Sequence, residues 1–133
     1  MTTAERTITE ETAQFITDTN YADLPDALRA EARRCILDGL AVMLAGTTEE
    51  CTRIIYQYIG DLGVSGPCRV PGFSDSLPAE FAALASGVSG HAHDYDDTQV
   101  SSAPDRVYGL LTHPTIPALS AALAVGQEVN ATG

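Results

Sequence analysis

Side chains that can move protons or hold a polar ligand are concentrated at residues 91–98 (HAHDYDDT) and continue at residues 113–115 (HPT). The two segments combine imidazole, carboxylate and hydroxyl groups. Carboxylates grouped this closely repel one another and raise one another's pKa, so a chain that only needs to fold seldom groups them. Such grouping is how acid–base sites are made. We therefore expect the functional site at these residues.

Acid–base chemistry on a small carboxylate substrate is the first function that these residues allow. Asp94 and His113 would exchange protons with the substrate. Thr98 would donate a hydrogen bond to a substrate oxygen. His113 lies just before a predicted helix that starts at Thr115, and the positive end of that helix can help to hold a carboxylate.

A metal site is the second possibility, because His91 and His93 are followed by Asp94 and Asp97. Imidazole and carboxylate groups are common ligands of transition metals. Two histidines separated by one residue bind one metal most readily from a strand, where both side chains share a face. The preceding residues 86–90 (SGVSG) make a poor strand. We therefore expect no metal site here.

A phosphoryl-transfer site is the third possibility, because Asp94, Asp96 and Thr98 match the D-x-D-x-T pattern of haloacid-dehalogenase-like phosphatases. That pattern needs a buried hydrophobic strand just before the first aspartate. Residues 85–93 contain one large aliphatic side chain, Val88, which argues against this function. Taken singly, Asp96 and Asp97 are typical of solvated loop carboxylates or helix caps, and Tyr95 is typical of a core residue whose hydroxyl finds a partner.

Composition limits the function further. The 133 residues are enough for one domain with a real core, and 44% of them are hydrophobic. A formal charge of -11 argues against nucleic acid and anionic membrane surfaces as partners. The seven basic residues are all arginine, so the chain has no lysine to form a Schiff base. Its three cysteines have no metal-ligand spacing and, with no signal-peptide pattern, they predict a cytoplasmic protein.

The N-terminal half is predicted to be helical. Thr7 and Glu10 fit a capping box, so a helix should follow through about Asp18 and bury Ala13, Phe15 and Ile16. A second helix of about twenty residues should begin near Pro25. Its apolar stripe contains Gly39, which indicates close approach of another backbone, and Gly46 is placed to end it in a left-handed conformation. A third helix should start at Thr48.

The C-terminal half contains two more predicted helices. Residues 68–73 are broken by proline and glycine and are a loop or edge strand at best. A fourth helix should have Pro78 in its first turn and end where Gly87 and Gly90 lead into the polar residues. Residues 99–111 are predicted to be a loop, and the last helix should run from Thr115 to Val129. The predicted fold is all-α, a bundle of about five helices in one domain, residues 1–133.

Four segments of the chain together resemble the MmgE/PrpD family. Residues 36–46 (ILDGLAVMLAG) are similar to the family's LLDTLGCALAG helix, and residues 82–87 (AALASG) to its AAFxNG segment. Residues 91–98 resemble its H-x-x-D-[FY]-D-D-T signature, and residues 112–115 (THPT) its HPS element. The segments come in the family's order from about residue 9 onward, apart from residues 101–111, which resemble an insertion beside the site.

The resemblance implies a lyase or isomerase. It places Asp94 and Thr98 in the active site and makes His113 an acid–base candidate, and we add His91, Asp97 and Thr115 as candidate substrate-binding residues. Family members act without a cofactor on small polycarboxylates, usually as dimers. They remove or deliver a proton next to a carboxylate, with loss of water, loss of carbon dioxide or inversion.

The resemblance also implies that these 133 residues correspond to the N-terminal part of a family member. The family's later histidine and its basic residues would lie beyond this part, as would a small α+β domain. We therefore expect the partners to be a small polycarboxylate and either a second copy or a second chain that carries the rest of the fold. The alternative is a truncated or split helical module that acts only in folding or oligomerisation.

Overall fold

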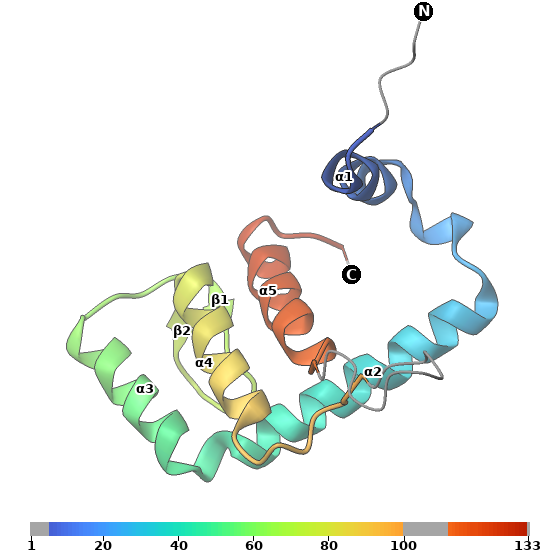
Figure 1. Cartoon of the computed structure of the whole chain (residues 1–133). Helices are drawn as coiled ribbons and strands as arrows, with labels where there is room; N and C mark the ends of the chain where they lie inside the picture. The colour runs from blue at the N-terminus through green and yellow to red at the C-terminus, as the bar shows by residue number, and fades with distance from the viewer. Residues whose placement is uncertain (1–5, 100–111, 133) are drawn as a thin grey trace, which may run out of the picture. The chain divides into compact units, whose positions relative to one another are not determined.

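The computed structural model of the chain describes residues 6–99 and 112–132. Its described part is mostly helical (Figure 1), which confirms the all-α prediction with five α-helices. The helices are α1 (Ile8–Asp18), α2 (Asp26–Ala45), α3 (Glu50–Asp61), α4 (Ala79–His91) and α5 (Thr115–Glu128). Two 3₁₀ turns, η1 (Tyr21–Asp23) and η2 (Gly46–Thr48), and a two-stranded antiparallel hairpin, β1 (Cys68–Arg69) with β2 (Ser76–Leu77), complete it.

The chain divides into two compact units, residues 1–33 and residues 34–133, with the boundary inside α2. The expected single domain over residues 1–133 stays a prediction. The predicted loop and insertion at residues 100–111 lie outside the described residues. Among the described helices, none has the length and apolar character needed to cross a membrane.

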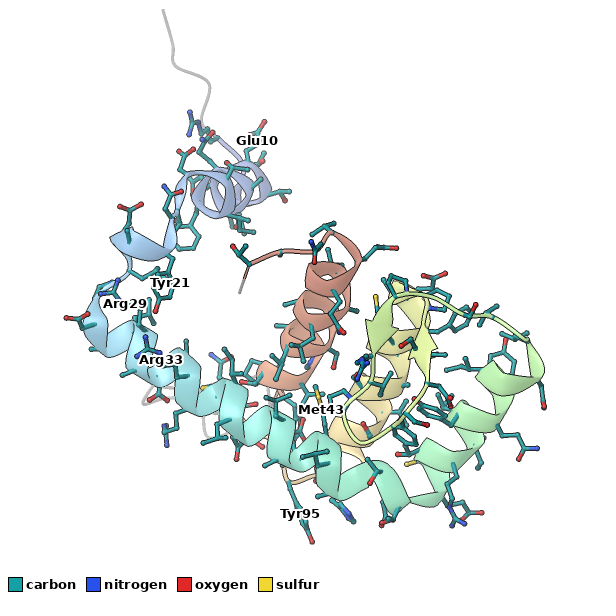
Figure 2. The ribbon with its side chains drawn as sticks, turned by 180° about the vertical axis from the view of Figure 1, so that it is seen from behind. Glu10, Tyr21, Arg29, Arg33, Met43 and Tyr95 are labelled. Atoms are coloured by element: carbon teal, nitrogen blue, oxygen red, sulfur yellow. The ribbon has the colours of Figure 1, made fainter. Side chains whose placement is uncertain are left out.

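The first unit contains the predicted capping box. The Thr7 hydroxyl accepts from the backbone N–H of Glu10 at 3.3 Å, and the Glu10 carboxylate accepts from the backbone N–H of Thr7 at 2.9 Å. The prediction that α1 buries its apolar residues is wrong, because Phe15 and Ile16 are 66% and 67% exposed. Amphipathic spacing marks a face that can be covered, but it does not say what covers it. Further along this unit, Arg33 donates to the Tyr21 hydroxyl (Figure 2).

The second unit packs α3, α4 and α5 around the small hairpin, with α4 between the other two helices (Figure 1). The buried cluster is rich in small side chains, which let the helices approach closely. It consists of Ile59, Cys68, Val70, Leu77, Ala79, Ala82, Ala85 and Ala124.

A second buried cluster joins the C-terminal part of α2 to α5. Met43 is fully buried there against Ile116 and Leu119. A Cβ atom added to Gly39 would lie 2.6 Å from the Cδ2 atom of Leu119. Gly39 therefore does lie in a tight contact, but with side chains of α5 and not with the backbone that the sequence predicted.

Gly46 does not end α2 in the predicted left-handed conformation. Among the described glycines, positive φ occurs at Gly63 and Gly72. Gly46 instead starts η2, and a Cβ atom there would lie 1.9 Å from the backbone oxygen of Ser89 in α4. The glycine is needed for the contact with α4.

Helix α4 is longer than predicted, because it continues through Gly87 and Gly90 to His91. A Cβ atom added to Gly90 would lie 2.8 Å from the Cδ1 atom of Ile116 in α5. A glycine is less favourable than alanine inside a helix by about 1 kcal/mol, but here it lets α5 pack closely against α4. Tertiary packing therefore extends the helix into the polar segment.

Candidate functional site

Four side chains, His91, Asp94, Asp96 and His113, form what we call the His–Asp cluster. One nitrogen or oxygen atom from each lies within 4.8 Å of the others. His91 is the last residue of α4, the two aspartates follow it, and His113 lies two residues before α5. The C-terminal end of one packed helix and the N-terminal end of the next therefore build the cluster. The cluster contains three of the site residues predicted from the sequence, His113, Asp94 and His91.

Asp96 is the buried residue of the cluster, with a side chain only 1% exposed. Its Oδ1 atom lies 2.8 Å from Nδ1 of His91 in a hydrogen bond, with the imidazole N–H donating. The same oxygen lies 3.4 Å from Nδ1 of His113, without the geometry of a hydrogen bond. Its Oδ2 atom has no hydrogen-bond partner. One buried carboxylate thus lies beside both histidines.

Sequence reasoning missed Asp96, because it treated Asp96 and Asp97 alike as solvated carboxylates or caps. Asp96 is buried, whereas Asp97 is half-buried and bonded to Thr115. Only the way in which residues 92–97 turn after α4 decides which carboxylate points inward, and no residue pattern gives that direction.

The pKa of His91 is raised above the ordinary value of 6.5. The hydrogen bond to Asp96 is the largest cause, followed by the charge of Asp96; the charge of Asp94 adds a smaller effect. Partial burial acts in the opposite direction, because it disfavours the charged imidazolium. His91 therefore holds a proton to higher pH than an ordinary histidine.

His113 lies beside both carboxylates of the cluster. Its Nε2 atom is 3.5 Å from Oδ1 of Asp94, and its ring meets the His91 ring edge-on with centroids 4.6 Å apart. The His113 side chain is 26% exposed, whereas that of Asp94 is 77% exposed. Asp94 also has a positive φ of 56°, an uncommon conformation for a residue other than glycine. An accessible carboxylate therefore faces the more sheltered imidazole.

Asp97 and Thr115, both predicted to bind substrate, are bonded to each other. Asp97 accepts from the backbone N–H of Thr115 at 3.1 Å and from its hydroxyl at 2.8 Å. The residue before α5, Pro114, makes no side-chain cap. Asp97 therefore anchors the start of α5 and, with it, the neighbouring His113.

Thr98, Tyr95 and His93 are not members of the cluster. The Thr98 side chain is exposed and makes no hydrogen bond within the described part of the chain. Tyr95 was expected in the core but is 70% exposed and projects away from the ribbon (Figure 2). Its ring stacks on His93, whose Nε2 atom lies 3.5 Å from a carboxylate oxygen of Glu49.

Neither of the other two candidate sites forms as the sequence suggested. His93 contacts Glu49 and Asp97 contacts Thr115, so the considered metal-ligand set of His91, His93, Asp94 and Asp97 does not assemble. The phosphatase pattern also fails, because the residues before Asp94 belong to helix α4 rather than to a buried strand.

An open groove of about 870 Å³ lies next to the cluster, between α4 and α5. His91, Asp96 and His113 line its polar end. The rest of its wall is mainly apolar and includes Leu84, Val88, Ile116, Pro117 and Ala121. Among the described residues that line it there is no arginine. The groove can hold a small molecule against the two histidines, but it brings no permanent positive charge.

Comparison with known proteins identifies relatives of this chain. The model of the MmgE/PrpD N-terminal domain matches residues 10–133. Cis-aconitate decarboxylase of Homo sapiens is 35% identical over 94 residues, which cover 70% of this chain and 20% of the relative. The Mus musculus enzyme of the same name is 33% identical over 94 residues, covering 70% and 19%.

A third relative, cis-aconitate decarboxylase-like protein oryM of Aspergillus oryzae, is 29% identical over 123 residues, covering 92% of this chain and 24% of the relative. The chain thus spans between 19% and 24% of the length of these relatives. No solved structure matched the chain.

Proposed function

The chain belongs to the MmgE/PrpD family, and on this premise we propose that His113 and Asp94 carry acid–base chemistry on a small polycarboxylate. The reaction is removal or delivery of a proton next to a substrate carboxylate, with loss of water, loss of carbon dioxide or inversion. One observation carries the proposal: the His113 ring lies 3.5 Å from Asp94 and 3.4 Å from Asp96 at the polar end of the groove. The decarboxylase relatives support the reaction class.

In this proposal the neutral imidazole of His113 takes a proton from the carbon next to a substrate carboxylate. The electron pair left on that carbon forms a double bond as the hydroxyl group takes the proton from the His113 imidazolium and leaves as water. In an inversion the electron pair instead takes a proton from a donor on the opposite face, which the rest of the site would supply. In a decarboxylation the imidazolium instead gives its proton to the carbon that carbon dioxide has left. Asp94 and Asp96 stabilise the imidazolium in each case, because opposite charges at this distance attract.

His91 and Thr98 are the substrate-binding residues of the proposal. Nδ1 of His91 donates its N–H to Asp96, so Nε2 can donate to a substrate carboxylate when the ring is protonated. Protonated His91 would make this a charge-assisted hydrogen bond. Thr98 offers an exposed hydroxyl. Asp97 and Thr115 could contact substrate only by giving up their mutual bonds, so we assign them the positioning of His113.

We infer that further polypeptide or a second subunit supplies cations to this site. A polycarboxylate would add negative charge to a chain that already carries -11 and has no lysine. Attraction of a polyanion requires positive potential, and the described groove lining supplies only histidines. We therefore propose that a homodimer partner or additional chain completes the site.

The test is the variant His113→Ala in the complete protein, assayed for turnover of small tricarboxylates, including cis-aconitate. We expect kcat to fall by about 10²–10⁴-fold, the usual contribution of an acid–base residue. His93→Ala is the matched control, because His93 lies outside the cluster, and it should retain activity. Circular dichroism and thermal unfolding check that both variants fold. Normal turnover by His113→Ala would contradict the assignment and leave a purely structural module as the better explanation.

A further inference from the structure

The His–Asp cluster has the composition and spacing of a metal site. It offers two imidazoles and two carboxylates, with one ligand atom from each within 4.8 Å of the others. Zinc binds such ligands at about 2.0–2.2 Å, so two ligands of one tetrahedral ion lie about 3.4 Å apart. The distance from Nδ1 of His113 to Oδ1 of Asp96, 3.4 Å, already has this value. Asp94 lies 3.5 Å from the other ring nitrogen, Nε2, so its side chain, which is 77% exposed, would turn to reach the same ion.

Unsatisfied polar atoms inside the cluster are a second, independent indication. Asp96 is 1% exposed, yet its Oδ2 atom has no hydrogen-bond partner, and Nδ1 of His113 has none either. A buried carboxylate oxygen without a partner is costly, and so is a buried ring nitrogen without one. A cation held between these residues would satisfy the carboxylate and one imidazole nitrogen.

The charge around the cluster favours a cation, and the ligand types favour zinc. Two carboxylates lie together in a chain with a net charge of -11, and no arginine lines the described groove beside them. Magnesium and calcium prefer oxygen ligands alone, whereas mixed imidazole and carboxylate sets suit zinc.

We propose that His91, Asp94, Asp96 and His113 form a binding site for one Zn²⁺ ion per chain. This site differs from the ligand set considered from sequence spacing, because its members come from two helix ends. The ion would occupy the His113 lone pair that proton transfer needs, so it would inhibit turnover. That consequence alone rests on the proposed function; the binding site does not.

Titration of the metal-free protein with zinc chloride, followed by isothermal calorimetry in a buffer that does not bind zinc, tests the proposal. We expect one Zn²⁺ per chain and much weaker binding of Mg²⁺. Asp96→Asn and His113→Ala should each weaken zinc binding by at least the roughly 10–100-fold that loss of an outer partner of a metal ligand costs. His93→Ala should bind zinc as the unmodified protein does.

Three results would overturn the site: no stoichiometric zinc, equal binding by Asp96→Asn and the unmodified protein, or an equal loss in His93→Ala. Circular dichroism shows that each variant is folded before it is titrated. The outcome is separable from the proposed function. Turnover without zinc binding rejects this site and leaves the acid–base proposal standing. Zinc binding by a protein without turnover supports this site and argues against the acid–base proposal.

Discussion

At the scale of single residues, Asp96 organises the candidate site. Its buried carboxylate fixes the His91 ring by a 2.8 Å hydrogen bond and lies 3.4 Å from His113. Removing the negative charge while keeping the shape, as in Asp96→Asn, should therefore change the behaviour of both histidines. A loop carboxylate in solvent would have no such effect.

The first prediction concerns the protonation of His91. Nuclear magnetic resonance titration of the histidine ring protons should give His91 a pKa above 6.5, because Asp96 stabilises the imidazolium. In Asp96→Asn the His91 pKa should fall back towards that value, with His93 as the internal reference. An unchanged His91 titration in the variant would show that Asp96 is not the cause.

The second prediction follows by linkage. The folded pKa of His91 is raised, so its contact with Asp96 contributes stability that is complete below the unfolded pKa of about 6.5 and is lost as pH rises through the folded pKa. The free energies of unfolding of the unmodified protein and of His91→Gln, measured in urea, should therefore differ more at about pH 5.5 than at about pH 8.5. An equal difference at both pH values would mean that His91 stabilises by packing alone.

At the scale of elements, the helix ends decide where the site residues lie. The 3.6-residue periodicity, the Thr7–Glu10 capping box and the glycine at position 39 predicted the five helices and one close contact from the sequence. The end of α4 could not be predicted, because Gly87 and Gly90 lower helix propensity locally while their packing against α5 favours the helix. The pairing of Asp97 with Thr115 spans 18 positions, and sequence spacing contains no signal for it.

The third prediction tests the contact between η2 and α4. Gly46→Ala should destabilise the protein by about 2 kcal/mol or more, because the new Cβ atom would lie 1.9 Å from the Ser89 backbone oxygen and the backbone must move. Gly60→Ala in α3 is the matched control. It meets no atom within 4 Å and should stabilise the helix by about 0.5–1 kcal/mol. Thermal or urea unfolding of the two variants should therefore give shifts of opposite sign.

At the scale of the whole molecule, apolar exposure and net charge act against each other. Several large apolar side chains are more than half exposed, among them Leu37 at 71%, Val129 at 65% and Ile54 at 60%. Burying such side chains against a partner would favour association. The charge of -11 opposes association between copies of this chain through mutual repulsion. The degree of association should therefore depend on salt concentration.

The fourth prediction is that the protein associates with itself and does so more strongly as salt is added. The screening length falls from about 10 Å at 0.1 M to about 3 Å at 1 M salt, so repulsion weakens while apolar contacts persist. Light scattering after size-exclusion chromatography should give a mass above that of one chain, rising with both protein and salt concentration. Mass spectrometry under denaturing conditions shows whether a second polypeptide is bound. A single chain's mass at every salt concentration would contradict self-association and leave a different polypeptide as the partner that the site needs.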